Sequence, residues 1–173
     1  QLAWVRATGA GRTRARRHGS AMQASIYELL KADHKTVKGL FEQMEASEDA
    51  ATRTRLVAQL KQELLAHSEA EDITLYQRIK PAERVHDLIL EAEEEHRVVS
   101  RLLGELERLS PENEKWKARA TVLRELVEHH VEEEEGEMFT KAKAILDREQ
   151  AQELGATFLA EKQRIKAALR SAA

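Results

Sequence analysis

Hydrophobic side chains recur every three or four positions along most of the chain after residue 22. This spacing places them on one face of an α-helix, so it predicts long amphipathic helices. We expect five: one opening at Ser25, three over roughly 51–80, 83–109 and 111–145, and a fifth from about 147. Because the connections are short, the pattern predicts an all-α, up-down-up-down four-helix bundle with an additional C-terminal helix packed on it.

Capping signals support several of these boundaries. Two capping boxes open the first and fifth helices, and prolines mark the end of the second helix and the start of the fourth. The residues are Ser25 with Glu28, Asp147 with Gln150, Pro81, and Ser110 with Pro111.

Six polar residues interrupt the hydrophobic stripes of the first four helices. They are His34, His67, Glu71, His96, His130 and Glu134. In each half, a single His is followed 33 or 34 residues later by a His-x-x-x-Glu pair, whose two side chains share one helix face. Buried carboxylates and imidazoles in such number are costly without a cation. We therefore expect these six residues to be metal ligands.

The two halves resemble tandem copies of one helical hairpin. Each has a single His, then His-x-x-x-Glu, then a bulky pair at the same offset, Leu75-Tyr76 or Met138-Phe139. This repetition strengthens the metal hypothesis, because chance would not place the pattern twice in register with the core.

One His-x-x-x-Glu pair by itself is weak evidence in a chain so rich in Glu. His129 and Glu133 have the same spacing, but His129 lies about 100° around the helix from His130, so we expect it to face solvent or to orient a ligand. Glu93, one turn before His96, is a weaker candidate for an orienting residue or an extra ligand.

The remaining polar residues favour surface positions. We expect His18, His86 and the acidic runs at 93–95 and 132–135, apart from Glu134, to be solvated. Tyr27, Tyr76 and Trp116 are interpreted as packing residues without a redox role. A purely structural bundle with a fortuitous His/Glu cluster is disfavoured by the cost of burying it.

Composition narrows the class of protein. The chain of 173 residues has no Cys, which excludes disulfides, iron–sulfur clusters and thiolate zinc sites, and no apolar run approaches a membrane span. The first 21 residues hold five Arg and no acid, so the remaining 23 basic and 31 acidic residues give a net charge of −8. An acidic body is a poor nucleic-acid binder, and we expect a cytoplasmic protein with no membrane partner.

We expect three regions: a disordered basic arm at 1–21, a bundle at 22–146 and a C-terminal helix at 147–173. The arm lacks helical periodicity and is interpreted as non-native or processed sequence. An Arg-rich targeting segment or an arm for anionic partners remains the alternative.

Imidazole and carboxylate without sulfur suit iron, manganese, zinc or copper. Six ligands over two sub-sites fit two ions better than one closed zinc site. If Glu71 and Glu134 bridge, one ion takes His34 with His67 and the other takes His96 with His130. Both ions then keep positions open for a bridging oxygen and for a small ligand.

These residues resemble the ligand series of the hemerythrin-like domain, also called the HHE cation-binding domain. The sequence around these residues also resembles that of the family, and the resemblance covers about residues 22–146. The matching segments are Asp33-His34-Lys35, Glu95-His96-Arg97, and His130-Val131-Glu132-Glu133-Glu134 leading into Met138-Phe139. The resemblance implies a four-helix bundle holding a non-haem di-iron centre of two iron ions with an oxo or hydroxo bridge. The six residues above would be the ligands, with the two Glu bridging.

One departure from the oxygen carriers of this family is informative. They place an additional His one turn before the third-helix ligand, where this chain has Ala92. Their second bridging acid is an Asp five residues after its His, whereas here Glu134 follows His130 by four. The lower His count favours sensing, peroxide turnover or nitric-oxide handling over reversible oxygen storage.

The leading hypothesis is a di-iron protein that binds or reacts with O2, H2O2 or NO. It would act as a sensor or in oxidative-stress defence, with catalase- or peroxidase-like activity if it is an enzyme. The alternative is a non-enzymatic iron- or oxygen-sensing protein that switches its stability or a partner contact, or an iron store. Small ligands are the expected partners, and a monomer is compatible with the chain.

Overall fold

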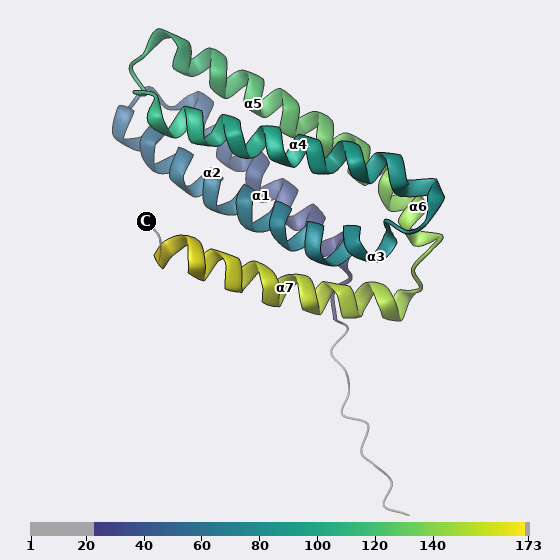
Figure 1. Cartoon of the computed structure of the whole chain (residues 1–173). Helices are drawn as coiled ribbons and strands as arrows, with labels where there is room; N and C mark the ends of the chain where they lie inside the picture. The colour runs from purple at the N-terminus through teal and green to yellow at the C-terminus, as the bar shows by residue number, and fades with distance from the viewer. Residues whose placement is uncertain (1–22, 172–173) are drawn as a thin grey trace, which may run out of the picture.

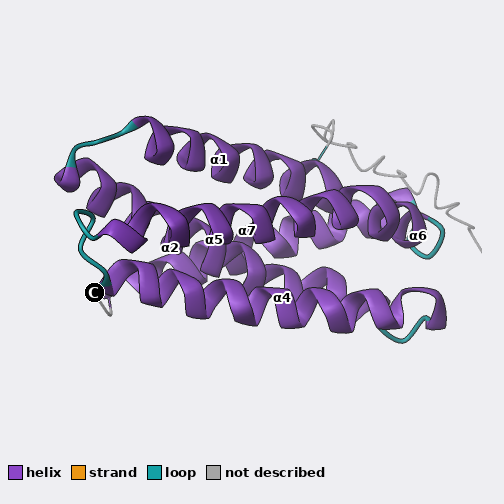
Figure 2. Cartoon of the chain, turned by 90° about the horizontal axis from the view of Figure 1, so that it is seen from above, coloured by secondary structure: helices purple, strands orange, loops and turns teal. Residues whose placement is uncertain are grey.

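The computed structural model describes residues 23–171, and the predicted arm at 1–21 lies outside the described residues. The helices run alongside one another as rods, and the C-terminal helix lies against them (Figure 1). Figure 2 shows the same rods from above, sharing one direction. Over the described residues the all-α prediction, a four-helix bundle with a C-terminal helix, is confirmed. None of the described helices is long and apolar enough to cross a membrane.

The rods divide into nine helical segments over the described residues. They are α1 (Ile26–Ala46), α2 (Ala50–Glu71), the π turn η1 (Asp72–Tyr76), α3 (Gln77–Ile79), α4 (Glu83–Arg108), α5 (Glu114–Glu133), the π turn η2 (Glu134–Met138), α6 (Phe139–Lys143) and α7 (Arg148–Ser171). The second rod is α2 with η1 and α3, and the fourth is α5 with η2 and α6.

The predicted capping boxes are present. Ser25 Oγ accepts from the Glu28 backbone N–H while a Glu28 carboxylate oxygen accepts from the Ser25 N–H at 2.8 Å. Asp147 and Gln150 make the same reciprocal pair at 2.8 and 3.0 Å. These bonds satisfy backbone donors that a helix start leaves open.

The predicted start of the fourth helix was wrong by about three residues. The helix begins at Glu114, because Asn113 caps it by accepting from the Lys115 N–H at 2.9 Å. Residues 110–113 instead form a turn, closed by the Asn113 N–H donating to the Ser110 carbonyl at 2.9 Å.

Two π turns were not predicted from the sequence. One begins directly after Glu71 and the other begins at Glu134, so both helices that carry a His-x-x-x-Glu pair are interrupted at the same place. Thr74 donates its hydroxyl to the Ala70 carbonyl at 2.6 Å, which gives a backbone oxygen beside the first turn a partner. A single π turn inside an α-helix frequently marks a functional site.

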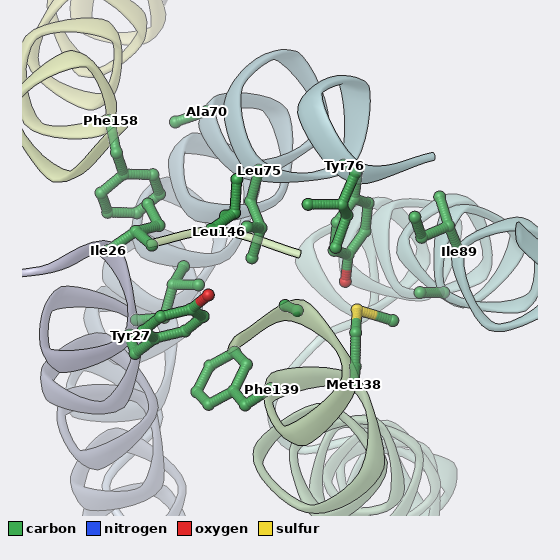
Figure 3. Close-up of a cluster of buried hydrophobic side chains, with 14 of the residues drawn as sticks. Ile26, Tyr27, Ala70, Leu75, Tyr76, Ile89, Met138, Phe139, Leu146 and Phe158 are labelled. Carbon is green, nitrogen blue, oxygen red and sulfur yellow. The ribbon is translucent and has the colours of Figure 1, made fainter. Parts of the chain in front are cut away.

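The hydrophobic core consists of two clusters. One joins the start of α1 to η1, α4, α6 and α7, and Tyr76, Phe139 and Phe158 are its largest fully buried side chains (Figure 3). The other fills the opposite end of the bundle, around Phe41 and Trp116. Along each of the four rods, the predicted ligand positions fall between the two clusters.

Helix α7 packs on α1, α2 and η1, and so covers the first hairpin (Figure 1). Its buried face includes a lysine and leaves a leucine outside: Lys162 is only 8% exposed, whereas Leu159 is 42% exposed. The buried positions recur at 151, 155, 158, 162 and 165, a helical stripe that reaches the lysine. At Gly155, an added Cβ would lie 2.5 Å from the Ala24 carbonyl oxygen, so the absence of a side chain allows this close approach.

Candidate metal centre

All six predicted ligands lie together in the interior. Each is at most 8% exposed, and the two glutamates are essentially inaccessible to solvent. The side chains form two groups whose ligand atoms lie within 4.8 Å of one another. The groups are His34, His67 and Glu134, and Glu71, His96 and His130.

Each glutamate lies between histidines of both hairpins. Glu134 Oε2 is 3.1 Å from His34 Nε2 and 3.6 Å from His130 Nε2. Glu71 Oε2 is 3.5 Å from His67 Nε2 and 3.7 Å from His96 Nε2. Donor atoms bound to one ion at about 2.0–2.2 Å are separated by about 3.0–3.4 Å. The geometry is thus close to that of a donor set in which both glutamates bridge.

Every one of the four imidazoles is held by a carboxylate through its Nδ1 atom. The pairs are His34 with Glu135 at 2.8 Å, His67 with Asp33 at 3.2 Å, His96 with Asp72 at 2.9 Å and His130 with Glu95 at 2.8 Å. Because a carboxylate accepts, Nδ1 carries the proton in each pair. Carboxylates in this position fix the orientation of metal-binding histidines and raise their basicity.

Two of the inward nitrogens face each other. His96 Nε2 and His130 Nε2 are 3.2 Å apart, and both rings are held with Nδ1 as donor. In that tautomer each Nε2 presents a lone pair to the other. A cation between them satisfies both, so the donor set fits a metal ion.

The four orienting carboxylates follow a twofold rule. Asp33 and Glu95 each precede the single His of their half and bind the His of its pair. Asp72 and Glu135 each follow the glutamate of the pair and reach across to the single His of the other half. The signal is visible in the sequence as an acidic residue directly beside every lone His and every paired Glu.

The residues around the six predicted ligands differ in part from expectation. Glu95 and Glu135 were expected to be solvated, and instead each accepts a hydrogen bond from a predicted ligand, His130 or His34, on another helix. Glu93 does not orient a ligand, since it pairs with Lys80 at 2.7 Å. His129 is exposed, as predicted for a solvent-facing residue.

The charges of the centre explain its protonation. Burial, and then the charge of Glu134, raise the pKa of Glu71 well above its usual range. Burial also opposes ionisation of Glu134, but its contacts with His34 and Glu71 outweigh burial and lower its pKa. Two carboxylates in one buried site do not both ionise without a compensating cation. Protons are therefore the alternative to metal ions in this cluster.

The pKa values of His67 and His34, the two histidines of the first group, are shifted in opposite directions. Burial lowers the pKa of His67 to about 4, against the opposing hydrogen bond to Asp33, so its ring is neutral near pH 7. Burial acts the same way on His34, but Glu134 and Glu135 outweigh it and raise the pKa of His34.

Aromatic rings pack against one histidine in each group. Tyr76 stacks on His96 with centroids 5.7 Å apart and planes at 8°, and Phe158 of α7 meets His67 edge-on at 6.1 Å. Burial, followed by the charges of Glu71 and Glu134, raises the pKa of Tyr76 well above its usual range. The tyrosine was predicted as a packing residue, and it also fixes the plane of an imidazole.

A small cavity adjoins the four imidazoles. Its volume is about 20 Å³, room for one or two water-sized groups. Apolar side chains make up most of the remaining wall: Val37, Leu64, Val99, Val127 and Val131. Such a wall admits a small uncharged molecule more readily than an ion.

Comparison with known proteins agrees with this geometry. Residues 25–142 match the model of the hemerythrin HHE cation-binding domain. The chain belongs to this family. A crystal structure of a hemerythrin HHE cation-binding domain-containing protein from Mycobacterium kansasii is similar, with a TM-score of 0.72 and 25% identity over 84% of this chain and 89% of that one.

A curated relative has a name that does not refer to the hemerythrin family. The chain is 30% identical over 141 residues to a protein of Nostoc sp. named DNA nickase. That match covers 82% of this chain but spans only 40% of the relative's length.

Proposed function

We propose that the chain is a non-haem di-iron protein whose centre binds or reacts with O2, H2O2 or NO. One observation carries the proposal: four imidazoles, each held at Nδ1 by a carboxylate, turn Nε2 toward two buried glutamates beside a small apolar cavity. Membership of a cation-binding family supports a metal at this place. We propose the cytoplasm as its location.

The side chains have distinct roles in this proposal. His34 with His67 would hold one ion and His96 with His130 the other, and the two glutamates would be shared. Two ions so bound would supply one-electron redox chemistry, with positions left free on each for a small molecule. The valines of the cavity wall exclude bulk water and favour an uncharged ligand.

The third-helix position that carries an additional His in oxygen carriers is a core residue here. Ala92 is buried in the hydrophobic cluster and supplies no donor atom. Fewer nitrogen ligands leave more positions open, which favours reaction or sensing over reversible carriage.

DNA cleavage is not part of the proposal for this centre. The cavity holds one or two water-sized groups, a volume that favours a small molecule over a nucleotide. The name of the relative from Nostoc sp. therefore suggests no second substrate for these six residues.

Stopped-flow absorption tests the proposed reactivity. The protein is loaded anaerobically with Fe²⁺ and mixed with O2, H2O2 or NO, alongside a His130→Gln variant loaded in the same way. We expect a charge-transfer band or peroxide loss in the wild type, reduced strongly in the variant. A spectrum that stays unchanged with all three molecules contradicts the proposal.

A second function, an iron sensor that acts through stability, is favoured by the same centre. The facing Nε2 atoms and the shared buried glutamates are unfavourable in the folded protein unless a cation joins them. Metal binding would then contribute directly to folding free energy. We expect a large fall in the melting temperature on iron removal, and equal melting of the apo and iron-loaded protein would exclude this function.

A further inference from the structure

The two metal sub-sites differ in what holds their orienting carboxylates. In the first sub-site, Asp33 contacts Lys162 and Glu135 contacts Lys31, at 2.5 and 3.2 Å. In the second sub-site, neither Asp72 nor Glu95 lies within 4 Å of a lysine or arginine of residues 23–171. The ligands are symmetric, whereas the positive charges behind them are not.

Lys162 is the more consequential of the two lysines. Its side chain is 11% exposed, and its Nζ lies 2.5 Å from Asp33 Oδ1 and 3.4 Å from Glu63 Oε2. The other oxygen of Asp33 accepts from His67 Nδ1 at 3.2 Å. A chain of contacts thus runs from α7 through Asp33 to a predicted ligand.

A buried ammonium is costly, which argues against an incidental contact. Docking of α7 does not require it, because Lys166 one turn later already ties α7 to Glu63 at 2.6 Å. Of these two lysines, only Lys162 reaches Asp33, the carboxylate that orients His67.

An ammonium at this position would weaken metal binding through two effects of the same sign. An ionised carboxylate behind an imidazole raises its basicity as a ligand, and an ammonium bound to that carboxylate reduces the gain. The ammonium would also repel a cation bound at the inward face of His67.

We propose that Lys162, acting through Asp33, makes the His34/His67 sub-site the weaker of the two, so that it fills last and releases its ion first. Lys162 is a positioning residue and does not touch the metal. The inference rests on the proposed metal centre and makes the last helix part of it.

Titration of the metal-free full-length protein with Co²⁺, followed by its d–d absorption, tests the order of filling. Unequal steps alone do not discriminate, because two neighbouring cations repel each other in any case. Assigning each binding step to a sub-site does discriminate. We expect His67→Gln to remove the weak step and His130→Gln to remove the tight one. The reverse assignment overturns the inference, whereas failure to bind Co²⁺ at all contradicts the metal centre itself.

Lys162→Gln tests the cause, because the amide still donates to Asp33 but carries no charge. We expect the affinity of the weak step to rise about tenfold, within the range that such outer contacts control, while the tight step is unchanged. Lys166→Gln is the matched control and should alter neither step. A fall in the weak-step affinity of Lys162→Gln, no change in it, or an equal rise in the control each overturns the inference.

Two further variants test whether Lys162→Gln acts through the lost charge or only by weakening the packing of α7. Lys162→Arg retains the charge and should restore the wild-type ratio of the two affinities. Asp33→Asn keeps an acceptor for His67 without the charge and should lower the weak-step affinity by about tenfold or more. If Lys162→Arg instead behaves like Lys162→Gln, the charge is not the cause and the inference fails.

Discussion

The two hairpins of this bundle present the same ligands from different surroundings. Each supplies one single His, one His-x-x-x-Glu pair, a π turn at the glutamate and two orienting carboxylates. Helix α7 packs mainly on the first hairpin, and there it adds Phe158 against His67 and Lys162 against Asp33. In the second hairpin, the ring that packs on His96 is Tyr76, contributed by the first. The two hairpins therefore supply the same ligands because of the duplication, and contacts from α7 make the surroundings of the first hairpin's ligands different.

The largest expected effect breaks the symmetry of the two glutamates. We predict that Glu134→Gln and Glu71→Gln both reduce metal content below about one ion per chain, because each carboxylate is shared. In the metal-free protein the two should differ. Glu71→Gln replaces a neutral acid and leaves stability nearly unchanged, whereas Glu134→Gln removes the charged partner of His34 Nε2 and costs about 1–3 kcal/mol.

Elemental analysis and urea unfolding measure the two properties separately. Equal loss of stability in the two metal-free variants would contradict the assignment of the proton to Glu71.

The next effect separates the two histidines of the first sub-site by pH. The pKa of His67 is lowered to about 4 in the folded protein, so its contribution to stability is lost as the pH falls from about 6.5 toward 4. The magnitude is on the order of 3 kcal/mol. The pKa of His34 is raised, so its contribution is full below about 6.5 and is lost as the pH rises through the raised value.

Urea unfolding of the metal-free protein across this range checks both signs. His67→Gln should flatten the loss of stability on the acid side, whereas His34→Gln should flatten the loss on the alkaline side. If the two variants change the profile in the same direction, the contrast between the histidines is wrong.

A smaller effect tests whether α7 acts on one hairpin alone. Gly155→Ala places a Cβ 2.5 Å from the Ala24 carbonyl and should cost about 1–3 kcal/mol. Hydrogen exchange should rise in α7 and at the start of α1 while α4 and α5 stay protected. Gly39→Ala is the control, because nothing lies within 4 Å of its added methyl group and Ala favours the helix. Uniform loss of protection in both hairpins would mean that α7 supports the whole bundle.

The smallest effect sharpens the ranking of the two lysines. Lys31 is 51% exposed beside Glu135, so water screens its charge. Lys31→Gln should change the weak-step Co²⁺ affinity by about threefold or less, well below the effect of Lys162→Gln. An equal or larger change would show that burial does not decide the strength of these contacts.

The sequence predicted the helices and the six gathered side chains because both depend on a period of 3.6 residues. The buried positions of α4 recur every three or four residues from Val85 to Leu106. The two π turns were missed, since a single wide turn leaves no periodic signal. The burial of Lys162 was missed for another reason. A lysine is normally expected at an exposed position, and its partner Asp33 lies on another helix, so the sequence does not show that the two side chains meet.

Metal content is the most direct test of the central claim, that the six buried residues bind two ions. The protein is loaded anaerobically with Fe²⁺, desalted and analysed for iron per chain, beside a variant that carries Glu71→Gln and Glu134→Gln together. We predict about two iron ions per chain in the wild type and nearly none in the variant. Less than about one ion per wild-type chain, or equal iron in both proteins, would contradict the account.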